Sequence, residues 1–227
     1  MKTGPIAACL WLVLSAGLLV SSRLSYAAEP ASAGPGLDAV VHRLQRHYQQ
    51  TSSFEAKFKE QIASSSGVKR DLEGTIKYRR PGRLRWDFAP PQQETIVADG
   101  TTLFVYQPDL SQVIETPLER AFRTSAPAAL LLGAGNIERD FAASAVSTAP
   151  EEHLVRLSLK AKADGTDITL GLDPATYNVV TLTLTDQLGN VTRLEFSEIR
   201  TNIPLDDSLF SFKVPEGVDV VAAPEPR

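Results

Sequence analysis

The sequence predicts a mainly β protein with helices, in which a single strongly curved antiparallel sheet, open or nearly closed as a barrel, is covered by helical segments. From Ser53 onward, apolar and polar residues alternate with a period of two in about ten short runs. Turn-forming pairs such as Asp99-Gly100 and Asp164-Gly165 separate these runs. Two segments with a helical pattern interrupt the alternation, and a sheet with one apolar face needs such a cover.

The first residues have the pattern of a secretory signal peptide. Lys2 is followed by the apolar run IAACLWLVLSAGLLV, and the small residues Ser25 and Ala27 fit the cleavage rule. We therefore interpret residues 1–27 as a signal peptide that is cleaved near Ala27, which predicts export to the periplasm. The alternative is an uncleaved membrane anchor, but the apolar run has about 15 residues and a spanning helix needs about 20.

Charge and cysteine content narrow the function classes. The chain has 23 basic and 27 acidic residues, and Lys2 and Arg23 are the only charged residues of the predicted signal. An acidic mature chain disfavours binding to nucleic acid. The single cysteine, Cys9, also lies in the signal, so the mature chain has no disulfide and depends on an ordinary hydrophobic core.

The first element of the mature chain is a predicted amphipathic helix. Residues 28–36 are a flexible linker rich in proline, glycine and alanine, residues 37–221 form one domain, and residues 222–227 are a tail. Within LDAVVHRLQRHYQQ, the apolar side chains recur with helical spacing. They are Leu37, Val40, Val41, Leu44 and Tyr48.

A second helical segment interrupts the strands between residues 117 and 141. Ser125 is a predicted N-cap, APAALLL is a short apolar helix, and Gly133 and Gly135 end it. Strand patterns then resume with HLVRLSLKA and continue to a last run, LFSFKV. Both helical segments are expected to lie in the mouth of the curved sheet.

The stretch RRPGRLRWDF combines arginines with large apolar side chains. In a strand, Leu84, Trp86 and Phe88 share one face, while Arg83 and Arg85 lie on the solvent face. A site for single-stranded nucleic acid would present aromatic and cationic side chains on the same face. The separation therefore favours a cavity for an apolar ligand.

Arg79 and Arg80 differ from the other two arginines because they precede Pro81 at the end of a strand or in a turn. One of them can reach over the rim of the sheet. No pattern typical of an enzyme accompanies these residues: the sequence has no Gly-x-Ser-x-Gly motif, no cysteine nucleophile and no phosphate-binding glycine loop. We therefore expect neither enzyme activity nor a metal or cofactor.

The chain resembles the LolA family of periplasmic outer-membrane lipoprotein carriers. The resemblance extends from about Leu37 to Val221 and rests on SSFEAKF, RRPGRLRWDF, ETIVADGTTLFVYQPDLSQV, APAALLLG and LFSFKVPEGVDVV. It implies an incomplete, open β-barrel covered by an α-helical lid. It also implies that the protein is a chaperone that binds the acyl chains of lipoproteins released by an inner-membrane ABC transporter. It also implies delivery to an outer-membrane receptor, with this chain acting as a monomer.

The resemblance also implies roles for individual residues. The arginine that holds the lid closed in the family corresponds to Arg80, and the lid corresponds to APAALLL. The predicted cavity wall consists of Leu84, Trp86, Ile96, Leu103, Val105, Leu130, Leu131 and Leu132. Both faces of the run TLFVYQ are apolar, so Phe104 and Tyr106 are an open alternative to the two residues chosen there.

Three other functions stay open at this point. A carrier of the same fold could bind another lipid or a glycolipid. A receptor anchored in the outer membrane would need a lipid-modified cysteine, which the mature chain lacks. A lipid hydrolase would need a nucleophile, and the sequence shows no motif for one.

Overall fold

The computed structural model describes residues 36–124, 135–149 and 151–223. These residues belong to one compact unit that begins at Gly34. None of the helices in this part of the chain has the length and apolar character needed to span a membrane. The first helix, α1, covers Leu37–Gln50 as predicted, and two short helices follow later in the chain, α2 (Leu118–Thr124) and α4 (Ile137–Asp140).

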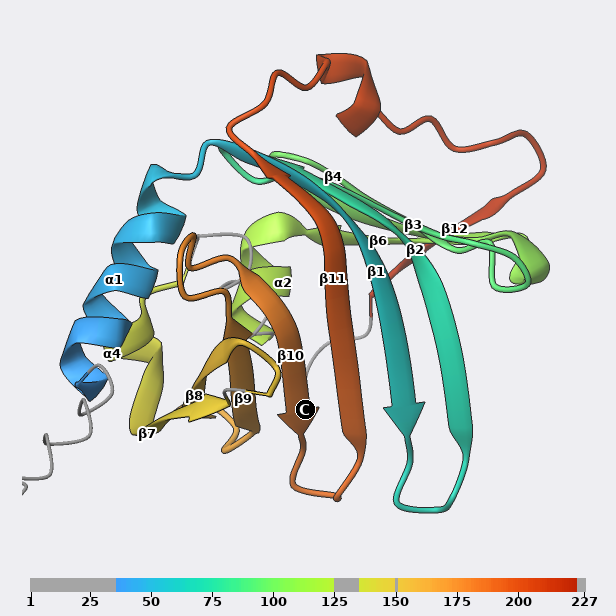
Figure 1. The fold of residues 1–227 in the computed structure, drawn as a ribbon. Helices are drawn as coiled ribbons and strands as arrows, with labels where there is room; N and C mark the ends of the chain where they lie inside the picture. Colours follow the sequence, from blue (N-terminus) through green and yellow to red (C-terminus); the bar gives the residue numbers. More distant parts are fainter. Residues whose placement is uncertain (1–35, 125–134, 150, 224–227) are drawn as a thin grey trace, which may run out of the picture. The chain divides into compact units, whose positions relative to one another are not determined.

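Twelve strands of the described residues form a single sheet (Figure 1). Their bounds are β1 (Ser53–Ala63), β2 (Lys69–Arg79), β3 (Arg83–Phe88), β4 (Thr95–Asp99), β5 (Thr102–Gln107), β6 (Gln112–Pro117), β7 (Phe141–Ala149), β8 (Leu154–Ala161), β9 (Asp167–Leu172), β10 (Val179–Thr185), β11 (Val191–Thr201) and β12 (Asp219–Ala222). The spatial order is β12-β6-β5-β4-β3-β2-β1-β11-β10-β9-β8-β7. Because the edge strands β12 and β7 do not pair, the sheet is unclosed, which confirms the predicted fold class.

Three details of the sheet differ from the prediction. Strand β7 has the sequence FAASAVSTA, whose small residues give little strand signal, and it was not predicted. The run LFSFKV was expected to be a strand, but its first residues belong to a 3₁₀ helix, η2 (Asp207–Phe210). The last strand, β12, pairs with β6 in parallel, so the sheet is antiparallel everywhere except at this edge.

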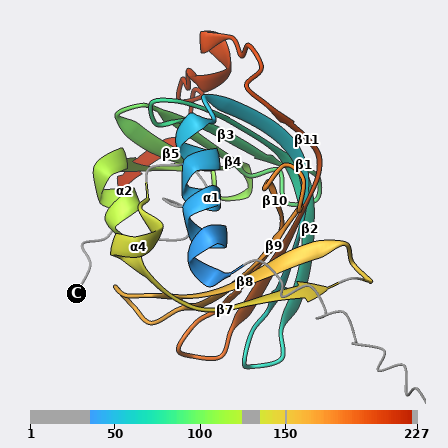
Figure 2. The same ribbon diagram turned by 60° about the vertical axis from the view of Figure 1, so that its left-hand side comes forward.

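The concave face of the sheet carries the main core, and α1 lies against it (Figure 2). Val40 and Leu44 of α1 are fully buried, and they belong to the same apolar cluster as Ala56 and Phe58 of β1. The helical spacing therefore places one face of α1 on the alternating apolar residues of the strands. This agrees with the predicted position of the helix in the mouth of the sheet.

The convex face of β3, β4 and β5 is covered by the C-terminal segment, residues 203–213, which contains η2 (Figure 1). Phe210 is buried there, and the ring of Phe212 lies 5.3 Å from that of Phe104. Arg83 donates to the Asp207 carboxylate at 2.7 Å, and Arg85 Nη1 donates to the Leu209 carbonyl at 3.3 Å. The expectation that both arginines only face solvent is therefore wrong, because they hold the C-terminal segment in place.

Candidate functional site

The five predicted wall residues in β3, β4 and β5 lie on one face of the sheet. The strand register shows this, because residues that pair directly across neighbouring strands share a face. The pairs are Leu84–Ala98, Trp86–Ile96, Ile96–Val105 and Ala98–Leu103. Leu84 belongs to the concave core, and Trp86, Ile96 and Leu103 pack against it. The predicted lid, residues 126–132, lies outside the described residues, and so do the three predicted wall residues within it, 130–132.

The register also decides between the two faces of TLFVYQ. Phe104 and Tyr106 both approach the ring of Phe212, with centroid distances of 5.3 and 6.0 Å. These two side chains thus lie under the C-terminal segment on the convex face. The alternating residues Leu103 and Val105 consequently face the concave side.

Three aromatic rings line the centre of the concave face. Trp86 and Phe88 of β3 are stacked, with ring planes 7° apart and centroids separated by 5.9 Å. Phe58 of β1 meets both rings edge-on at 5.2 Å. Gly74 of β2 lies between Phe58 and Phe88 in the register, and its lack of a side chain leaves space for these rings. The result is a rigid apolar wall.

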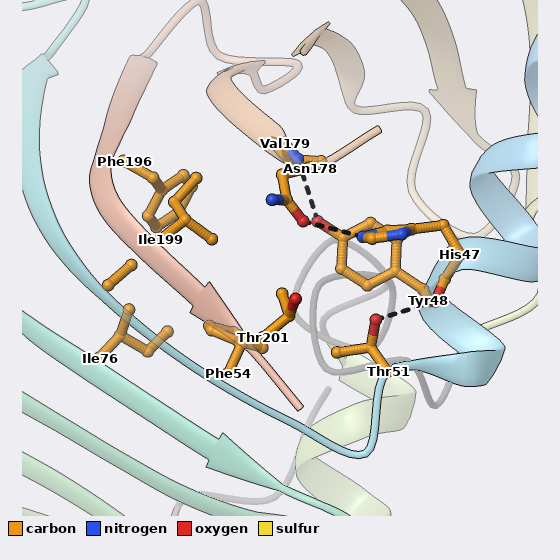
Figure 3. A pocket seen from close by; sticks show the side chains of 11 residues that line it. His47, Tyr48, Thr51, Phe54, Ile76, Asn178, Val179, Phe196, Ile199 and Thr201 are labelled. Atoms are coloured by element: carbon orange, nitrogen blue, oxygen red, sulfur yellow. Dashed lines mark hydrogen bonds between the residues drawn. The ribbon is translucent and has the colours of Figure 1, made fainter. Parts of the chain in front are cut away.

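A small cavity lies between the end of α1 and strands β1, β2, β10 and β11 (Figure 3). Its apolar lining is Phe54, Ala56, Ile76, Val179, Phe196 and Ile199. The cavity volume is about 30 Å³, enough for one or two water molecules but not for an acyl chain. An elongated apolar ligand could enter only if α1 or its neighbours moved away from the sheet.

The last turn of α1 supplies a polar rim to the cavity (Figure 3). His47 Nε2 lies 2.9 Å from Asn178 Oδ1, and the imidazole donates because an amide oxygen can only accept. The backbone N–H of Val179 donates to the Tyr48 hydroxyl at 3.2 Å. Burial of this hydroxyl raises the pKa of Tyr48 to about 12, so it stays neutral. The two bonds tie α1 to the start of β10.

Arg80 also contacts the C-terminal end of α1. Its Nη2 donates to the Tyr48 carbonyl at 2.5 Å. This carbonyl belongs to the last turn of α1, where backbone oxygens have no partner within the helix and the helix dipole favours a cation. Arg80 therefore anchors the C-terminal end of α1 to the rim of the sheet beside β2.

Folding stability is expected to fall as the pH drops below about 6.5, in part because of His47. Burial lowers the pKa of His47 from its ordinary value; Arg43 lowers it further, and the bond to Asn178 opposes the shift. Between the lowered folded pKa and about 6.5, the unfolded chain binds more protons than the folded chain, so protonation favours unfolding. Urea unfolding between pH 7 and 5 should show a shallower decline for His47→Gln, which keeps a donor but does not titrate. An unchanged slope in His47→Gln would contradict this role.

The sequence interpretation missed the polar rim. His47 was not among the predicted site residues, and Asn178 lies in a turn far away along the chain. Their contact depends on the return of β10 beside α1, which no local pattern reveals. One signal did exist: Tyr48 is the last apolar position of the helix, where a buried hydroxyl needs a polar partner.

Comparisons with known proteins agree with this geometry. The family model described as "Outer membrane lipoprotein carrier protein LolA" matches residues 49–213. The outer-membrane lipoprotein carrier protein of Methylobacillus flagellatus is 34% identical over 183 residues, which is 80% of this chain and 88% of that protein. The corresponding protein of Chromobacterium violaceum is 33% identical over 190 residues, 84% of this chain and 91% of that protein.

A solved structure shares the fold. The crystal structure of an uncharacterized conserved protein from Thermus thermophilus matches with a TM-score of 0.52 and 13% sequence identity, over 82% of this chain and 98% of that one. At this identity the match concerns the fold alone. The family model and the relatives decide the assignment: this chain belongs to the LolA family of outer-membrane lipoprotein carrier proteins.

Proposed function

We propose that this protein is a periplasmic chaperone that binds the acyl chains of lipoproteins and carries them to the outer membrane. The observation that supports it most is the apolar concave wall of Phe58, Trp86 and Phe88, which belongs to or packs against the same apolar cluster as the buried face of α1. The wall offers a shaped apolar surface, and its three side chains have no acidic, basic or nucleophilic group. The relatives that bear the carrier name cover most of the chain.

The need for such a carrier follows from the hydrophobic effect. Exposing one chain of about sixteen carbons to water costs roughly 12 kcal/mol at ~0.8 kcal/mol per methylene. Acylated cargo therefore cannot cross an aqueous compartment alone. The carrier must also release it, and a cover that returns to the empty cavity competes with the ligand and lowers its net affinity.

The partners and the compartment are part of the same proposal. The cargo comes from an inner-membrane ABC transporter and passes to an outer-membrane receptor. The signal peptide, residues 1–27, directs the chain to the periplasm, where it acts as a monomer. The protein is a carrier and not an enzyme. Arg80 and the predicted wall residues are the proposed latch and acyl-chain site.

The transport role is tested by incubating the protein with spheroplasts and measuring lipoprotein released into the supernatant. We expect release well above a buffer control, and mass spectrometry of the released complex should show acylated peptide. Release no greater than with buffer rejects the role. A different copurifying lipid would identify a carrier of that lipid instead.

A charged side chain in the cavity should abolish cargo binding. Ile199 lines the cavity and packs against the core, so Ile199→Glu places a carboxylate where the acyl chains would lie. Because an unpaired charge is disfavoured in apolar surroundings, we expect released lipoprotein to fall at least about tenfold. The matched control is Val68→Glu at a residue that is 58% exposed in the β1–β2 turn. Equal release by the two variants, both shown to be folded by thermal melting, would contradict the proposed site.

A further inference from the structure

The indole nitrogen of Trp86 is a buried hydrogen-bond donor. Among the described residues it has no acceptor, although Trp86 as a whole is only partly buried. Buried tryptophan N–H groups usually have a partner, and a buried unsatisfied donor in a native protein calls for an explanation. The surroundings explain why the described residues supply no acceptor.

The concave-face neighbours of Trp86 are apolar. Ile76 and Ile96 lie directly opposite it on β2 and β4, and Leu84 and Phe88 precede and follow it on the same face of β3. None of these side chains can accept a hydrogen bond. A phenylalanine at position 86 would supply a similar ring without a buried donor. The N–H group is thus a cost for folding that the apolar wall does not require.

The ring position is held firmly. The indole is stacked on Phe88 and meets the edge of Phe58, so its N–H group has little freedom to turn toward water. The cavity in Figure 3 reaches Ile76, the cross-strand partner of Trp86. A ligand that extends from this cavity past Ile76 on β2 to the neighbouring strand β3 would contact the indole.

We infer that Trp86 Nε1 donates a hydrogen bond to a carbonyl oxygen of the cargo's acyl linkage, and so recognises acyl esters or amides rather than hydrocarbon alone. This inference depends on the proposed carrier function. In a diacylglyceryl cysteine, the ester linkages that join the hydrocarbon chains to glycerol have carbonyl oxygens, which accept hydrogen bonds but do not donate them. A single donor in an apolar wall matches that chemistry. It positions the linkage, while the wall supplies the apolar contact area.

The test compares two lipids and two proteins in a thermodynamic cycle. The lipids are a short peptide with an S-(dipalmitoyl-glyceryl)cysteine and its dihexadecyl ether analogue, which lacks the ester carbonyls. Trp86→Phe keeps the ring and removes the donor. A neutral hydrogen bond to a carbonyl contributes enough that we expect ester binding to weaken by about three- to tenfold in Trp86→Phe. Ether binding should change less than about twofold, because the ring contacts remain.

A spectroscopic measurement separates a hydrogen bond from a packing change. The chain has two tryptophans, Trp11 and Trp86, so the indole ¹H–¹⁵N signal that is missing from Trp86→Phe identifies Trp86. The ester lipid should move this signal downfield, and the ether lipid should not. Equal losses for both lipids in Trp86→Phe, or equal indole shifts, would overturn the inference while leaving the carrier function intact. Failure of wild-type protein to bind either lipid would overturn both.

Discussion

Replacement of Arg80 by leucine is expected to tighten cargo binding and slow its delivery, each by about tenfold. The variant loses a charge-assisted hydrogen bond to the Tyr48 carbonyl at the end of α1. Such a bond contributes about 1.5–3 kcal/mol, and about 1.4 kcal/mol corresponds to a factor of ten in an equilibrium. Without it the covered state of the cavity is less stable, competes less with the acyl chain and returns more slowly after loading.

Two measurements check this expectation. Affinity is measured by titration with an acylated peptide, and delivery by the rate at which loaded protein transfers lipoprotein to outer-membrane vesicles. Arg70→Leu is the control, because it removes another arginine of β2 that binds the Gln92 side chain rather than a helix. If Arg80→Leu and Arg70→Leu bind and transfer alike, Arg80 is not the latch.

Replacement of Gly74 by alanine is expected to lower the free energy of unfolding by more than about 3 kcal/mol, a large share of the stability of a typical domain. A Cβ atom on Gly74 would lie 2.0 Å from the Asp87 carbonyl oxygen in β3 and 2.9 Å from Cε1 of Phe58. The first contact is with backbone, so relief requires the separation of β2 from β3. The second would move Phe58 away from Trp86 and so disturb the concave wall.

Urea unfolding measures the effect, and the matched control is Gly36→Ala at the start of α1. An added Cβ at Gly36 meets nothing within 4 Å, and the backbone φ there is −59°, which suits alanine. Gly36 is the N-cap of α1 and alanine is a poorer N-cap, so the control should lose no more than about 1 kcal/mol relative to the wild type. A midpoint for Gly74→Ala equal to that of the control would show that the sheet adjusts to the extra atom at this point.

Local patterns predicted most elements because each depends on the chain's own periodicity. The spacing of Leu37, Val40 and Leu44 defined α1, and the Asp99-Gly100 pair marked the β4–β5 hairpin, where the Asp99 carboxylate accepts the N–H of Thr101 at 2.8 Å. The alternation in RLRWDF separated Leu84 and Trp86 from the arginines. The pattern failed where residues have a low strand propensity, as in the alanine-rich strand β7. It also failed where an apolar run packs without pairing as a strand, as in residues 209–214.

The features of the proposed site also fall into two groups, those that the sequence predicted and those that the tertiary structure decided. The sequence alone determined the curved sheet, the amphipathic cover and the apolar face of β3, because these follow from residues close together in the chain. The choice of Arg80 over Arg79 and the open form of the barrel came from the resemblance to the LolA family. Only the tertiary structure decided that Leu103 rather than Phe104 faces the cavity, that Arg80 reaches the end of α1, and that Arg83 binds the C-terminal segment. The two arginine contacts join residues that are distant in the sequence, and both faces of the strand that contains Leu103 are apolar. Their choice depends on strand register and on which segment covers each face, and both are set when the whole sheet assembles.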